Sequence, residues 1–314
     1  MERFTLVFNA IIPLVLYIVI GIVGAQAFHL NREKIDVLYK LCFYVFLPCL
    51  LIKGFYDVEG GIPQVGTVVI VSVLSLICLP VISSIVAKLM IKEPKTQAGF
   101  AVASWKHNSG IVGLPIATAL LKSDALSVFL IFLAISAFIS SFMTILQITY
   151  HLNSGKRPDP KKVFIDVIKN PMLIACIVGI LMRFVFHIEL GYIPHKVIWT
   201  LNDAATPVGL FIIGCTIAFN HGVKNIKYVA VGCFLKLIFA PIFTTTLGYL
   251  IGLRGPALAA IMLSQTVSTA INSSSMVYGM GGDVDMTNEI IAGTTICCMF
   301  TIFMWAFVIL GIQG

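Results

Sequence analysis

The sequence predicts an all-α polytopic membrane protein with ten transmembrane helices, arranged as two inverted repeats of five. Three observations predict it: an apolar composition, apolar runs of membrane-spanning length along the whole chain, and an echo between its two halves. Of the 314 residues, 59% are hydrophobic and 11% are charged, whereas a soluble domain carries about 25% charged residues. The mean hydropathy is +1.00. We therefore expect the chain to lie in a lipid bilayer.

Ten apolar runs have the length that a membrane-spanning helix needs, which is about 20 residues. The predicted spans are 4–28, 35–55, 65–90, 97–121, 125–150, 170–186, 194–219, 227–252, 256–280 and 288–310. The polar segment 151–162 follows the fifth span. It separates a first repeat, 1–150, from a second repeat, 163–314.

Basic residues concentrate in the loops that follow odd-numbered spans. These are Arg32, Lys34, Lys88, Lys92, Lys95, Lys156, Arg157, Lys161, Lys162, Lys224 and Lys227. The opposite side carries Arg3, Lys53, Lys122, Lys196 and Arg254. Because short loops rich in Lys and Arg stay in the cytoplasm, both termini are predicted outside the cytoplasmic membrane and 151–162 inside the cell. The net charge of +7 follows from this asymmetry and does not indicate a nucleic-acid partner.

Prolines recur at matching places in the two halves, each pair about half a chain apart. The pairs are Pro13 with Pro171, Pro48 with Pro207, and Pro80 with Pro241. Gly21 and Gly179 follow the first pair at the same spacing. Such an echo indicates an internal duplication. Since each repeat has an odd number of spans, the two repeats must have opposite orientations, as in many transporters.

The fourth span contains residues that an ordinary membrane helix does not tolerate. Its middle reads Lys106-His107-Asn108-Ser109-Gly110, followed by Gly113 and Pro115. A lysine at the bilayer centre costs roughly 2.5–3.5 kcal/mol on insertion scales, and Gly and Pro weaken the helical hydrogen-bond ladder. A break at this depth is tolerated where it is buried in protein or lines a watery cavity. The span is therefore predicted to be discontinuous at a solute-binding site.

The ninth span is the expected partner of the fourth, with the two breaks meeting near the bilayer midplane. Its segment 264–275 contains nine Ser, Thr, Gln and Asn side chains, among them Gln265, Ser268, Thr269 and Asn272. One or two such groups commonly join membrane helices to each other. A cluster this dense, opposite another polar segment, favours a role in lining the site.

These residues resemble the auxin efflux carrier family, which includes bacterial malate and malonate permeases and plant auxin exporters. The first motif is Asn108-x-Gly110-x-x-Gly113-x-Pro115. The others are Lys169-Asn170-Pro171, residues 204–211 with Gly214, Leu235-Lys236-Leu237 with Pro241, and Tyr278-Gly279. The resemblance covers nearly the whole chain.

The resemblance implies the fold of bile acid sodium symporters and auxin exporters, in which helices 4 and 9 are broken and cross at the substrate site. It implies a scaffold of helices 1, 2, 6 and 7, through which a homodimer forms, and a moving core of helices 3–5 and 8–10. One position departs from the family pattern. Where members often have a proline in helix 9, this chain has Ser268, so that break would rest on Ser268, Thr269 and Asn272.

The charges inside the spans indicate the kind of solute. Lys106, His107 and Lys236 lie within apolar spans, and Asp203 is the acid embedded in one. Buried cations with few acids suit an anion, which freed backbone amides could also bind. We predict a secondary transporter of organic anions, namely carboxylates such as malate, malonate or auxin-like acids, contacted by Asn108 and Ser109.

Each charged residue also has a structural interpretation. For Lys106, two roles are equally expected: it contacts the substrate, or it pairs within the core or reaches the cytoplasm. Lys236 is expected to pair with the broken helix. His107 is either proton-sensitive or simply hydrogen-bonded, and Asp203 either carries a proton or, as we favour, balances a buried lysine.

Ser136 and Ser140 share one face of the fifth span. They either line the solute path or pack helices together.

The membrane potential constrains the coupling. Moving one charge across 100 mV is worth about 2.3 kcal/mol, so an inside-negative potential drives anions out without a coupling ion. Uptake would need H⁺ or Na⁺. Because the spans contain no chain of acidic residues that could relay protons, we favour uncoupled export or transport weakly linked to H⁺. Coupling to Na⁺ is the alternative, because Gln265 and Asn272 could contribute to a sodium site.

No metal or other cofactor is expected, because no Cys/His cluster is present. A non-transporting membrane sensor with the same fold is the main competing class. A channel is less expected because no filter motif appears, and an enzyme less still because hydrolase and nucleotide-binding motifs are missing.

Overall fold

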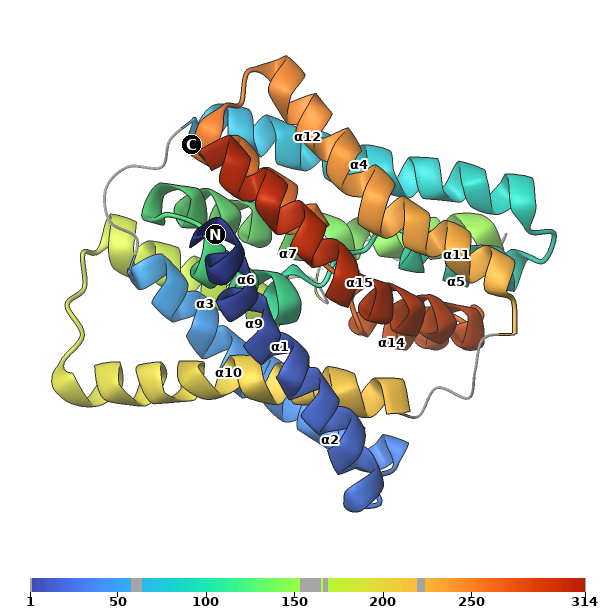
Figure 1. Cartoon of the computed structure of the whole chain (residues 1–314), viewed down its shortest axis with the longest axis horizontal. Helices are drawn as coiled ribbons and strands as arrows, with labels where there is room; N and C mark the ends of the chain where they lie inside the picture. Colours follow the sequence, from blue (N-terminus) through green and yellow to red (C-terminus); the bar gives the residue numbers. More distant parts are fainter. Residues whose placement is uncertain (1, 58–63, 153–164, 166–168, 219–223, 314) are drawn as a thin grey trace.

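The computed structural model describes residues 2–57, 64–152, 165, 169–218 and 224–313, and within them every regular element is a helix (Figure 1). Seven helical segments of this part are long and apolar enough to cross a membrane. They are Val7–Ala27, Glu33–Tyr56, Val65–Met90, Ser123–Leu152, Tyr192–Ala218, Ile226–Ile251 and Val284–Gln313. Large apolar side chains such as Leu89 and Leu250 are exposed on their outer surface, as contact with lipid requires. The all-helical polytopic class is thereby confirmed.

The helices follow one another with short connections, and several contain π-helical turns, labelled η. The first half has α1 (Glu2–Ala27), α2 (Arg32–Leu41), η1 (Cys42–Phe46), α3 (Leu47–Tyr56), α4 (Val65–Met90), α5 (Pro94–Ala103), η2 (Ser109–Gly113), α6 (Leu114–Leu120) and α7 (Ser123–Leu152). The second half has α9 (Pro171–Ile180), η3 (Leu181–Val185), α10 (Tyr192–Ala218), α11 (Ile226–Phe234), η4 (Leu235–Phe239), α12 (Ala240–Ile251), α13 (Gly255–Gln265), α14 (Asn272–Gly279) and α15 (Val284–Gln313).

Three of the ten predicted spans are short or interrupted. The sixth is the short pair α9 and η3. The fourth is interrupted between α5 and η2, and the ninth between α13 and α14. Of the segment 151–162, the part from residue 153 onward lies outside the described residues. The grouping of these helices into two inverted repeats remains a prediction.

Two helix pairs at one side of the molecule pack through glycines. In Figure 1 the blue α1 and the yellow α10 lie away from α4 and α12. A Cβ atom on Gly21 would overlap the carbonyl oxygen of Phe211, so α1 and α10 are in backbone contact. On α9, a Cβ on Gly179 would lie 2.8 Å from the Cβ of Phe55 on α3. Gly21 and Gly179, which occupy matching positions in the two halves of the sequence, thus each allow close packing between two helices.

Two proline-containing helices, α4 and α12, are held by polar side chains from neighbouring helices. Because Pro241 has no N–H, the carbonyl of Leu237 four residues earlier loses its helical donor. The indole Nε1 of Trp305 on α15 donates to that carbonyl at 2.8 Å. On α4, the carbonyl of Pro80 accepts a hydrogen bond from Gln147 Nε2 of α7 at 2.8 Å. These bonds fix α4 against α7, and η4, which leads into α12, against α15.

We expect Gly21→Val to destabilise the protein, because the new side chain must push α1 and α10 apart. Overpacking of this kind costs about 1–3 kcal/mol. The measurement is the temperature at which the detergent-purified protein loses its monodisperse peak. Gly66→Ala is the control, since a Cβ at Gly66 meets no atom within 4 Å. Equal melting of both variants would contradict the backbone contact.

Candidate functional site

The two interruptions are hydrogen-bonded to each other. The amide of Asn108 donates to the carbonyl of Ser268 at 2.9 Å, and the amide of Ala270 donates to the carbonyl of Lys106 at 3.0 Å. His107 and Thr269 are thereby paired in a short antiparallel bridge. Broken helix ends leave backbone groups without helical partners. Here each break supplies partners for the other.

Side chains satisfy further backbone groups at the breaks. The Thr269 hydroxyl donates to the carbonyl of Ala103, at the end of α5, at 2.6 Å. The Thr269 amide donates to the hydroxyl of Thr294 on α15 at 3.1 Å. The side chains of Ser268 and Thr269 are almost fully buried. Thr269 therefore holds the break in place, and neither residue lines the cavity described below.

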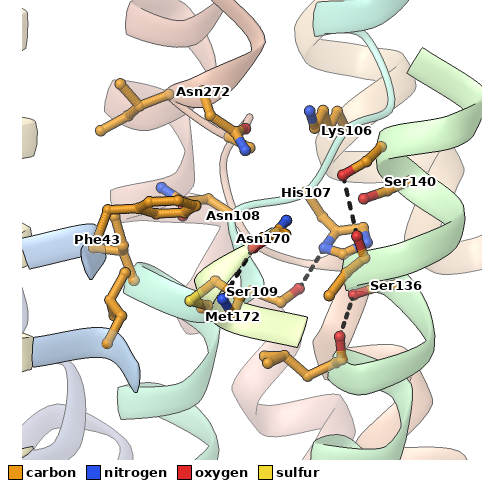
Figure 2. Close-up of a pocket in the computed structure, with 18 of the residues that line it drawn as sticks. Phe43, Lys106, His107, Asn108, Ser109, Ser136, Ser140, Asn170, Met172 and Asn272 are labelled. Carbon is orange, nitrogen blue, oxygen red and sulfur yellow. Dashed lines mark hydrogen bonds between the residues drawn. The ribbon is translucent and has the colours of Figure 1, made fainter. Parts of the chain in front are cut away.

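His107 is linked to α13 through Ser109. The Ser109 hydroxyl donates to the carbonyl of Ser264 at 2.8 Å and lies 2.7 Å from Nδ1 of His107 (Figure 2). A hydroxyl has one hydrogen, so Nδ1 of His107 is the donor in the second contact. Its Nε2 is then left as an acceptor, and it is buried without a hydrogen-bond partner in the described part of the chain.

A cavity of about 90 Å³ opens beside the paired breaks. Figure 2 shows Phe43 on one side of it and Ser136 and Ser140 on the other. Eight sequence-predicted site residues line it: Lys106, His107, Asn108, Ser109, Gly110, Ser136, Ser140 and Asn272. The hydroxyl of Ser136 is already used within α7, where it donates to the carbonyl of Leu133 at 2.9 Å.

Five lining residues from the helices opposite were missed: Tyr39, Phe43, Leu47, Asn170 and Met172. Tyr39 and Phe43 lie in the second span and stack at 5.8 Å between ring centroids. Their apolar run looked like lipid contact, so nothing in the sequence pointed to them. Asn170 and Met172 open α9, where the Asn170 Oδ1 accepts from the Met172 amide at 2.9 Å. The motif Lys169-Asn170-Pro171 could have pointed to Asn170, but it served only as evidence for the family resemblance.

The cavity is rich in hydrogen-bond donors and poor in negative charge. Of the described residues that line it, none is Asp or Glu. The amine of Lys106 donates to the sulfur of Met276 at 2.9 Å, and a thioether is a weak acceptor. The Asn108 Nδ2 and the Asn272 Oδ1 are buried with no partner in the part that the structure describes. Such orphaned groups are rare in proteins and call for a partner.

Five predicted residues lie elsewhere, besides Ser268 and Thr269. A Cβ on Gly113 would lie 3.0 Å from the Phe129 ring, so this glycine permits close helix packing. Pro115 lines a second cavity, of about 340 Å³. Lys236 is fully buried and donates to the carbonyl of Gln265 at 2.7 Å, which is the structural pairing expected for it. The side chain of Gln265 is buried, and neither its nitrogen nor its oxygen has a hydrogen-bond partner among the residues that the structure describes.

The expectation that Asp203 balances a buried lysine is wrong. Asp203 is exposed, lines the second cavity beside Pro115, and accepts a hydrogen bond from Asn202 at 2.9 Å. The two buried lysines are bonded to Met276 and to the Gln265 carbonyl instead.

The sequence matches a family model described as "Membrane transport protein" over residues 6–306. The chain belongs to this family. The match confirms the resemblance to auxin efflux carriers. An "uncharacterized transporter" of Methanothermobacter thermautotrophicus is 20% identical over 284 residues, covering 89% of this chain and 91% of the relative. The protein is therefore a membrane transporter and not an enzyme.

We expect Thr269→Val to destabilise this transporter by about 1–3 kcal/mol, because the buried Ala103 carbonyl would lose its donor. Valine has nearly the shape of threonine, so packing changes little. The matched variant Thr269→Ser keeps the hydroxyl and should keep most of the stability. Thermal unfolding of the three proteins in one detergent tests this. If Val and Ser variants unfold alike, the hydroxyl does not hold the break.

Proposed function

We propose that this transporter moves small organic anions across the cytoplasmic membrane, namely carboxylates such as malate, malonate or auxin-like acids. The observation that carries the proposal is the cavity beside the paired breaks, where the Asn108 amide nitrogen lacks a partner and the Lys106 amine meets a weak sulfur acceptor, in a lining free of Asp and Glu among the described residues. A carboxylate is the simplest group that completes such a set, because hydrogen bonds to charged acceptors are about twice as strong as neutral ones.

Three kinds of donor would hold the carboxylate. The Lys106 amine donates to the weak sulfur acceptor of Met276, and the Asn108 amide nitrogen has no partner in the described part of the chain. Gly110 lines the cavity in the first turn of the segment Ser109–Leu120, where helix-start amides favour an anion. A cavity of about 90 Å³ holds several waters. It therefore has room for a carboxylate group of such an acid.

For the topology we propose ten crossings in two inverted repeats, with helices 4 and 9 crossing at the site. The seven long spans, the short α9–η3 pair and the two interrupted helices together supply ten. The Phe4 and Phe307 rings stack at 6.3 Å, so both chain ends lie on one side, as an even number requires. The matching glycine contacts of α1 and α9 support the repeat.

For the mechanism we propose elevator-type alternating access, in which helices 3–5 and 8–10 shift against helices 1, 2, 6 and 7. The cavity lies at this division. Most of its polar residues come from the breaks and from α7, whereas Tyr39, Phe43, Asn170 and Met172 come from the other group. The second group would form the scaffold and the contact of a homodimer. Both termini would lie outside.

We propose export driven by the membrane potential, or transport linked to H⁺. The Nε2 of His107, an orphaned acceptor at the cavity, is the candidate proton-binding atom. The alternative is a Na⁺-coupled symporter. The unpartnered oxygens of Gln265, Ser268 and Asn272 favour it, whereas the Lys236 amine at the carboxyl end of α13 opposes it by placing a fixed cation there.

The decisive experiment is uptake of labelled malate, malonate and indole-3-acetate by proteoliposomes under an imposed potential. Saturable flux of one of these acids supports the proposal. Binding without flux would instead favour a sensor with this fold. Replacing Na⁺ by choline in the same assay separates the ions, since loss of flux without Na⁺ favours the symporter.

We expect Asn108→Ala to reduce flux at least about tenfold, because one hydrogen bond to a charged group is worth about 1.5–3 kcal/mol. Initial rates in the same proteoliposomes measure it. Asn225→Ala, on an exposed residue at the start of α11, is the matched control. Unchanged flux in the Asn108 variant, with normal protein insertion, would remove its side chain from the mechanism.

Lys106→Met should weaken binding of the transported acid by roughly 10- to 100-fold, since it removes a charged donor while keeping the length of the side chain. The measurement is the dissociation constant from a thermal-shift titration. The control is Lys227→Met, which removes an exposed lysine. An unaltered constant would leave Lys106 with a packing role only.

A further inference from the structure

A second polar feature lies on the outer surface between α4 and α7. A groove of about 260 Å³ runs between the two helices. Pro80, Ser84, Lys88, Met143, Gln147 and Tyr150 are among the residues that line it. The neighbouring lining residues Val81 and Ile85 are 49% and 53% exposed. Because these helices span the membrane, the groove faces lipid.

The mouth of the groove has the chemistry of a phosphate site. The Lys88 amine donates to the Tyr150 hydroxyl at 2.6 Å and lies 4.0 Å from the centroid of its ring. An ammonium has three hydrogens and a tyrosine hydroxyl has one of its own, so both groups keep donors for an anion. No Asp or Glu lines the groove among the described residues.

The groove has the depth and position that suit an acyl chain. Lys88 and Tyr150 lie near the ends of α4 and α7, on the lysine-rich side with Lys92 and Lys95. From there to Pro80 is about 12 Å along α4, at 1.5 Å per residue. A charged headgroup would thus lie at the interface while its chain followed the apolar floor into the bilayer.

We propose that this groove binds one anionic phospholipid, with its phosphate on Lys88 and Tyr150 and an acyl chain along Val81, Ile85 and Met143. Charge complementarity selects an anionic lipid, because no acid among the described lining residues neutralises the free donors at the mouth. Lysines near this surface attract anionic lipids generally. The groove adds a fixed place for one of them.

The lipid would also contact the residue that supports the broken fourth span. Gln147, in the floor of the groove, donates to Ser84 Oγ at 2.8 Å and accepts from the indole Nε1 of Trp105 at 2.8 Å. Trp105 directly precedes Lys106 and is buried. A lipid in the groove therefore restrains Ser84 and Gln147, and through them the segment that leads to the cavity.

Native mass spectrometry of the detergent-purified protein, titrated with phosphatidylglycerol or phosphatidylcholine of equal chain length, tests the binding. We expect one phosphatidylglycerol per protomer to be retained in preference to phosphatidylcholine. Lys88→Met should abolish that preference, and Lys227→Met should keep it. Ile85→Trp should block the groove, whereas Ile70→Trp, an exposed site elsewhere on α4, should not.

The outcomes are separable. Equal retention of both lipids, or retention by Lys88→Met, would overturn the proposal. Displacement of the lipid by millimolar glycerol phosphate would show an anion site that does not require a lipid, and it would overturn the proposal. A dimer that dissociates on Ile85→Trp would also overturn it, because a second copy of the chain would then occupy the groove. For the link to the cavity, phosphatidylglycerol should slow amide exchange at residues 104–107 in the wild type and not in Gln147→Leu. No slowing would refute the link. None of these readouts depends on transport.

Discussion

The backbone pairing between the two interruptions is the constraint on which the rest of the site depends. In a bilayer no water is at hand to satisfy a freed N–H or C=O, and each orphan costs several kcal/mol. Neither the fourth nor the ninth span could open alone at this depth. The bonds from Asn108 to Ser268 and from Ala270 to Lys106 satisfy backbone groups of both broken spans. They also fix Lys106, His107 and Asn108 in one geometry beside the cavity.

The buried lysines follow from the same constraint. The carboxyl end of α13 leaves carbonyls unpaired and carries a partial negative charge. The amine of Lys236 meets the Gln265 carbonyl there, so this lysine needs no acidic partner. Lys106 is different, because its amine donates to the sulfur of Met276, which is a weak acceptor. Lys236 therefore has a structural role, whereas Lys106 can still donate hydrogen bonds into the cavity.

The sequence foretold the parts of the site whose cause is local. A lysine, a histidine, two glycines and a proline within one span cost too much for a continuous helix, whatever surrounds them. The ninth-span break was harder to foresee, since Ser268 stands where a proline is common. Its cause is tertiary: the Asn108 amide and the Thr269 hydroxyl stabilise it. Tyr39 and Phe43 could not be found, because an apolar residue facing a cavity looks the same in sequence as one facing lipid. The expected partner of Asp203 was wrong for a related reason, because the position of a residue in the sequence does not reveal which face of α10 it occupies.

The division of polar and apolar residues around the cavity bears on how a bound anion could move. Lys106, His107 and Asn108 belong to the breaks, whereas Tyr39, Phe43 and Met172 line the opposite wall. Asn170 also lies on that wall, and its Oδ1 is already bonded to the Met172 amide. A solute held by the breaks would therefore make its directional bonds to one group of helices and mainly dispersion contacts to the other. Directional bonds resist sliding, whereas contacts with aromatic rings and a flexible thioether re-form at each position with little change in energy. A shift of one group past the other would then carry the anion along without breaking the bonds that select it.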